Sequence, residues 1–92
     1  MKVYKTRESS FMVMNNTTFY IIDGNGVRFF TVTTIRNKLM VGKGDLNTVT
    51  TEKGKKEFIE NLKVDYGNNL TKTTMKELKK FQSETLKNLK SW

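Results

Sequence analysis

The chain has 92 residues, of which 17 are lysine or arginine and 9 are aspartate or glutamate, and its formal net charge at pH 7 is +8. It contains no cysteine and no histidine, which excludes disulfides, thiolate zinc sites, thiol nucleophiles and imidazole acid–base chemistry. We therefore expect one domain over residues 1–92 that is not an enzyme and that holds no metal and no cofactor.

The first half of the chain, residues 1–50, carries most of the aromatic and β-branched residues and predicts an antiparallel meander of short strands. The pair Asn15-Asn16 and the stretch from Asp23 to Gly26 are favourable turn sequences, because asparagine and glycine tolerate positive φ. The glycine-rich stretch that follows the last strand is expected to break the pattern. We expect strands over residues 3–6, 11–14, 17–22, 27–34 and 38–41.

The second half, residues 51–92, is rich in charged, helix-favouring residues and predicts two amphipathic helices. The first runs from about Thr51 to Tyr66 and ends at Gly67, since glycine suits the left-handed position after a helix. The second begins at Thr74 with a capping box, in which a glutamate follows the threonine by three residues, and continues to the end of the chain. Its apolar residues form one arc of the helical wheel: Met75, Leu78, Phe81, Leu86, Leu89 and Trp92.

These elements predict an α+β fold, in which an antiparallel β-meander of four to five strands is followed by two amphipathic helices packed on one face. Neighbouring apolar residues such as Phe29 and Phe30 must point to opposite faces of the sheet. Two helices on one face would then leave an apolar second face uncovered, which usually marks a partner surface. A strongly curled sheet that buries both sets of side chains is the alternative.

The lysines of the last helix gather in one arc of the helical wheel, and its two glutamates lie together beyond the edge of that arc. Such a row is suited to a phosphate backbone, because each ammonium group that binds a phosphate releases a counterion from the nucleic acid. The alternative is a solvated helix face that is rich in lysine because the genome is rich in A and T. The candidate nucleic-acid-binding residues of this helix are Lys76, Lys79, Lys80, Lys87 and Lys90.

Basic and aromatic residues of the strands extend the candidate site. We expect Tyr20 and Phe30 to lie with Arg28 on a helix-free face of the sheet, where the two aromatic rings would contact a partner. The alternative is that these rings belong to the core, as is more usual for aromatic residues in strands. The basic residues expected to join the lysine row in one continuous nucleic-acid-binding surface are Arg28, Arg36, Lys38 and Lys43.

No apolar stretch follows the charged N-terminal residues, so we do not expect these residues to act as a signal peptide. No apolar run approaches the roughly 20 residues that a membrane span needs. We therefore expect a protein that does not contact membranes and that stays in the cytoplasm, which is the host cytoplasm if a phage encodes it.

The charge and the lysine row favour a small basic accessory protein that binds the phosphate backbone of DNA or RNA and is non-catalytic. The composition, with abundant lysine, asparagine and threonine and no proline, resembles that of small accessory proteins of AT-rich bacteriophages. The alternative function is a phage-type inhibitor that binds an acidic or nucleic-acid-binding host protein, such as a host enzyme or defence complex, through an exposed sheet face or edge. Self-association into a homo-oligomer through the same sheet face is a third hypothesis.

Overall fold

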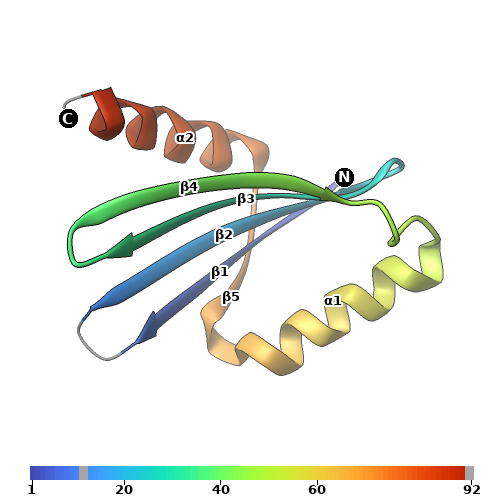
Figure 1. Ribbon diagram of the computed structural model, residues 1–92. Helices are drawn as coiled ribbons and strands as arrows, with labels where there is room; N and C mark the ends of the chain where they lie inside the picture. The colour runs from blue at the N-terminus through green and yellow to red at the C-terminus, as the bar shows by residue number, and fades with distance from the viewer. Residues whose placement is uncertain (11–12, 91–92) are drawn as a thin grey trace.

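The computed structural model describes residues 1–10 and 13–90, with side chains up to residue 87, and shows one sheet flanked by two helices (Figure 1). Neighbouring strands are antiparallel, in the order β4-β3-β2-β1-β5. This confirms the predicted α+β class and the meander. The elements are β1 (Lys2–Ser10), β2 (Met14–Asp23), β3 (Gly26–Ile35), β4 (Lys38–Leu46), α1 (Glu52–Tyr66), a 3₁₀ turn (Gly67–Asn69), β5 (Leu70–Thr73) and α2 (Met75–Lys90).

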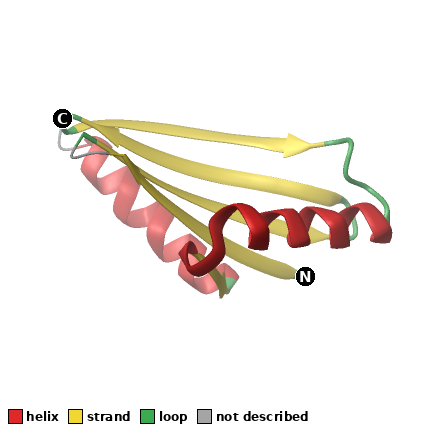
Figure 2. Cartoon of the chain, turned by 90° about the horizontal axis from the view of Figure 1, so that it is seen from below, coloured by secondary structure: helices red, strands yellow, loops and turns green. Residues whose placement is uncertain are grey.

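The two helices cover opposite faces of the sheet, so the expectation that both pack on one face is wrong (Figures 1 and 2). Successive strand residues point to opposite faces, and here both sets find a helix to pack against. The second set of apolar strand residues is therefore explained without an uncovered apolar face and without a strongly curled sheet. On the face under α2, called the α2 face below, Val3, Phe19 and Ile21 of the strands form a buried apolar cluster with Leu78 of α2. On the opposite face, called the α1 face, Tyr4, Ile22 and Val27 form a buried cluster with Ile59 of α1.

The short strand β5 carries the chain from one face to the other. It pairs with β1 at the edge of the sheet, from Val3 opposite Thr73 to Thr6 opposite Leu70. Figure 1 shows it between the end of α1 and the start of α2. A strand of four residues with only one apolar side chain has no recognisable alternation, and for this reason the sequence did not place a strand here.

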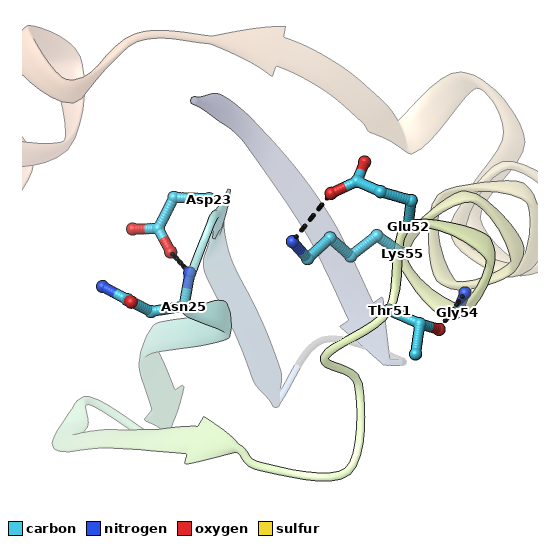
Figure 3. A network of polar contacts seen from close by, with 6 residues as sticks. All are labelled: Asp23, Asn25, Thr51, Glu52, Gly54 and Lys55. Atoms are coloured by element: carbon cyan, nitrogen blue, oxygen red, sulfur yellow. Dashed lines mark hydrogen bonds and ion pairs between the residues drawn. The ribbon is translucent and has the colours of Figure 1, made fainter.

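Both helices begin where the sequence predicts, and α1 also ends where predicted. The predicted end of α2, at the end of the chain, lies outside the described residues. The Oγ1 of Thr51 accepts a hydrogen bond from the backbone N–H of Gly54 at 3.0 Å (Figure 3), and α1 ends at Gly67 with φ 51°. The Oγ1 of Thr74 accepts from the backbone N–H of Glu77 at 3.3 Å. Each threonine thereby satisfies one of the free N–H groups at a helix start.

The predicted turn at Asn15-Asn16 is wrong, because both residues lie inside β2. The Nδ2 of Asn16 donates to the Oγ1 atoms of Thr31 and Thr33, both at 2.8 Å, and its Oδ1 accepts from the Oγ1 of Thr18 at 2.9 Å. These neighbours satisfy the amide within the sheet, so Asn16 gains nothing from a turn. Residues 11 and 12 of the strand expected at 11–14 lie outside the described residues.

The glycine-rich stretch at 42–45 also belongs to a strand, β4, and does not break the sheet. A Cβ at Gly44 would come within 3.0 Å of the Phe29 ring, and one at Gly42 would lie 3.2 Å from the methyl group of Thr31. The glycines therefore make room for the side chains of β3 on the α1 face. The predicted turn at 23–26 is confirmed as the connection between β2 and β3.

Candidate functional site

The described lysines of α2 are exposed because the other side of the helix is anchored in the core. Leu78 is 1% exposed, and the ring of Phe81 lies 5.2 Å from that of Phe19 and 6.2 Å from that of Phe30, centroid to centroid. The exposed lysines of α2 are Lys76, Lys79, Lys80 and Lys87. The side chains of Lys90 and Leu89, and the whole of Trp92, lie outside the described residues.

These four lysines form no ion pair within the part of the chain that the structure describes. The ion pairs found there are Arg28–Asp23, Lys55–Glu52 and Lys63–Glu60, and the last two lie on α1. Figure 3 shows the pair of Lys55 with Glu52 beside the start of α1. Helix α1 has four lysines and four carboxylates, whereas α2 has five lysines and two carboxylates. Uncompensated positive charge is therefore a property of α2 and not of α1.

Two basic residues of β1 extend this charge along the α2 face. Lys5 and Arg7 line a groove of about 350 Å³ between β1 and α2, together with Lys80. The Nζ of Lys5 lies 5.7 Å from the centroid of the Phe19 ring. Two glutamates of α2 line the same groove and lower its positive potential. Lys5 and Arg7 were not predicted as site residues, although their spacing of two residues places both on one face of a strand.

Arg28 and Lys43 also lie on the α2 face, on β3 and β4. The Nη2 of Arg28 donates to the carboxylate of Asp23 at 2.9 Å, so its charge is already engaged. A hydrogen bond of 2.9 Å from the backbone N–H of Asn25 (Figure 3), and then the charge of Arg28, hold the pKa of Asp23 below its usual value. Of the two, Lys43 is therefore the better placed to meet an anion.

The predicted residues Arg36 and Lys38 lie at the β3–β4 turn, at the end of the sheet toward which α2 runs (Figures 1 and 2). Both are exposed. The register of β4 places Lys38 on the same face as Leu46, which packs on the α1 face. The structure thus brings the α2 lysines and Lys43 to one face with Arg36 at its end, and leaves Lys38 on the opposite face.

Tyr20 and Phe30 do not share a helix-free face, and that expectation is wrong. Tyr20 lies on the α1 face, where its ring meets Phe58 edge-on at 5.4 Å between centroids. Phe30 lies on the α2 face against Phe81. Burial, and then the neighbouring Tyr66, raise the pKa of Tyr20 to about 12. Both rings serve as core contacts beneath helices.

The described residues offer no constellation for metal chemistry, since no three of their carboxylates come together. Within the same residues, every buried side-chain nitrogen or oxygen has a hydrogen-bond partner. Neither described helix is long and apolar enough to cross a membrane. Comparison of the chain with protein-family models, curated proteins and solved structures finds no match. The function must therefore be argued from the charge and shape of the surface.

Proposed function

We propose that this chain is a non-catalytic nucleic-acid-binding protein that contacts phosphate groups with the outer side of α2. One observation carries the proposal: the exposed lysines of α2 lack carboxylate partners among the described residues, although α1 matches its lysines with an equal number of carboxylates. A row of free ammonium groups on a rigid helix is suited to a phosphate backbone. A cytoplasmic accessory role fits this proposal.

The distribution of carboxylates argues against codon bias as the whole explanation. An AT-rich genome raises the lysine content of both helices alike, and the two helices do have similar numbers of lysines. The same bias gives no reason for α2 to have half as many carboxylates as α1. The charge of α2 therefore reflects the absence of acidic partners more than an excess of lysine.

The dimensions of the row suit several phosphates. Lys76 and Lys87 are separated by about 16 Å along the helix axis, at roughly 1.5 Å per residue. One strand of a duplex presents a phosphate about every 3.4 Å along its axis, so the row faces a run of phosphates. Lys5, Arg7 and Lys43 flank the helix on the same face. Contacts of this kind are to the backbone, so binding should depend little on base sequence.

Fluorescence anisotropy with labelled duplex and single-stranded oligonucleotides, titrated at several salt concentrations, tests the proposal. If the four described α2 lysines each contact a phosphate, log K falls with log salt at a slope of about −3.6 for duplex DNA and about −2.8 for single strands. Absence of binding at low salt would contradict the proposal.

A pair of matched triple variants tests the location of the site. Replacing Lys76, Lys80 and Lys87 by glutamine reduces the magnitude of the duplex salt slope by about 2.7. The control replaces three lysines of α1 and removes the same charge: Lys53, Lys56 and Lys63. We expect the control to retain nearly the wild-type slope. Equal losses in the two variants would mean that net charge alone, and not the α2 surface, attracts the nucleic acid.

A protein-binding inhibitor is the second candidate, and the observation in its favour is the exposed edge of β4. An uncovered edge strand can accept an extended segment of a target protein. Binding of such a target would be insensitive to the α2 glutamine variant and to nuclease. Binding of nucleic acid would be weakened by the α2 glutamine variant and abolished by nuclease.

A further inference from the structure

The outer edge of β4 is the longest unpaired strand edge of the sheet. β4 comes first in the strand order and pairs only with β3, in an unbroken register from Ile35–Lys38 to Val27–Leu46. It has nine residues, whereas β5 at the opposite edge has four. Natural edge strands are usually protected by proline, a bulge, brevity or charged side chains. β4 has no proline, pairs with β3 without a bulge and is nine residues long, so its protection comes from the charges of Lys38, Lys43 and Asp45. Its free N–H and C=O groups can still pair with another strand.

The turn before β4 determines which of its residues offer these groups. Arg36 and Asn37 form a two-residue connection with φ of 49° and 69°, the conformation that closes a tight hairpin. In such a hairpin Ile35 and Lys38 are a hydrogen-bonded pair, and the pattern then alternates along the strands. The backbone groups of residues 39, 41, 43 and 45 consequently face the outer edge.

Two of these outward residues carry opposite charges. Lys43 and Asp45 are exposed and lie two positions apart on the α2 face. Within the part of the chain that the structure describes, neither forms an ion pair, since Arg28, which faces Asp45 across the strands, is held by Asp23. The edge therefore presents one free cation and one free anion side by side.

The β4 strand of a second copy, running antiparallel, can match the charges of Lys43 and Asp45 with opposite charges. When two copies pair about Gly44, Lys43 of each lies opposite Asp45 of the other, and residues with outward backbone groups face one another. When they pair about Lys43, that lysine meets its own copy, which is unfavourable. Gly44 at the centre carries no side chain to obstruct the approach. Charge thus favours the register about Gly44 over the register about Lys43, and it pairs residues 42–46 of the two β4 strands.

We propose that two copies of this chain pair through β4, antiparallel about Gly44, into one continuous sheet. The two-fold axis of this pairing is perpendicular to the sheet, so both α2 faces lie on the same side. The two lysine rows then belong to one basic surface. A strand from a target protein could occupy the same edge, but the mutual fit of Lys43 and Asp45 favours a second copy.

Charge exchange at these two positions tests the pairing, with molar mass measured by sedimentation equilibrium over a dilution series. We expect a wild-type dimer that dissociates on dilution. Lys43→Asp and Asp45→Lys each place two like-charge pairs in the interface and raise the dissociation constant by about tenfold or more. The double variant restores complementary pairs and recovers the wild-type constant. An equimolar mixture of the two single variants forms a mixed dimer.

Matched controls place the same change of charge on α1, away from β4. Lys53→Asp and Asp65→Lys should keep the wild-type dissociation constant, and circular dichroism verifies that every variant is folded. A wild-type monomer at all concentrations overturns the inference, as does a dimer that both single variants leave intact. Failure of the double variant to recover overturns the register about Gly44. The outcome is independent of the proposed function, because no nucleic acid is present.

Discussion

The two faces of the sheet are both closed by a helix, yet they differ in how they use charge. On the α1 face, two of the four lysines of the helix form ion pairs with its carboxylates, and Lys55 is 6% exposed against Glu52. On the α2 face, the helix buries Leu78 and partly buries Met75 and Phe81, and its described lysines are exposed and form no ion pair with a described residue. The difference lies in the carboxylates, since the lysine counts are similar. The net charge of +8 therefore describes neither face, and function has to be inferred from each face separately.

The faces also differ in how the helices are anchored. α1 buries two apolar residues, Ile59 and Leu62, at 6% and 5% exposure. Among the described side chains of α2, Leu78 is the one buried apolar residue, and the other buried residue is Thr85, whose Oγ1 donates to the carbonyl of Phe81 at 2.8 Å. α2 thus depends more than α1 on a single apolar side chain.

Truncation of Leu78 in α2 and of Ile59 in α1 should produce the largest losses of stability, and it compares the anchoring of the two helices directly. Leu78→Ala leaves a cavity against Val3 and Phe19 and lowers the free energy of unfolding by about 2–5 kcal/mol. Ile59→Ala should fall in the lower part of that range, because Leu62 still anchors α1. Urea denaturation measures both. A smaller loss for Leu78→Ala than for Ile59→Ala would contradict the view that α2 has the more concentrated anchor.

The sequence was informative where structure is determined locally. The threonine caps predicted the starts of both helices and Gly67 predicted the end of α1, since capping depends on residues three or four positions apart. The lysine row of α2 was also predictable from the sequence, because helical periodicity places these lysines on one side of the helix. The groove cations Lys5 and Arg7 were also within reach of strand alternation.

The remaining features depend on contacts between distant parts of the chain. Asn16 stays in a strand because Thr31 and Thr33, on another strand, accept from its amide. The face that α2 occupies depends on β5 pairing with β1, which no local pattern indicates. The pairing of Arg28 with Asp23 is also a consequence of the hairpin geometry. Because these contacts join residues that are distant in the sequence, local sequence patterns predict helices and strands well but predict their positions in the fold poorly.

Alkaline pH should weaken the α1 face selectively. The pKa of Tyr20 is raised from its ordinary value of 10.0 to about 12, so the neutral phenol is favoured in the folded protein. Its contribution is complete below pH 10 and is lost as the pH rises through the folded pKa near 12. Discounted for the partial exposure of the ring, the loss is on the order of 1 kcal/mol.

Urea denaturation of the wild type and of Tyr20→Phe at pH values across this interval measures the effect. Phenylalanine keeps the edge-on contact with Phe58 and removes the titrating group. The free energy of unfolding of Tyr20→Phe should therefore fall less than that of the wild type as the pH rises. An identical decline in both proteins would assign the effect to the other tyrosines or to the lysines.

The helix caps provide the finest comparison of the two faces. Thr51→Ala and Thr74→Ala each remove a side-chain acceptor from a helix start and should lower the free energy of unfolding by about 0.5–1 kcal/mol. The hydrogen bond is 3.0 Å long in α1 and 3.3 Å in α2, so Thr51→Ala should cost slightly more. Serine at each position retains the acceptor and serves as the control. If Thr74→Ala proves the costlier change, the first turn of α2 needs its cap more than α1 does. The row of unpaired lysines beginning at Lys76 would be the physical reason, because positive charge near a helix start opposes the helix dipole.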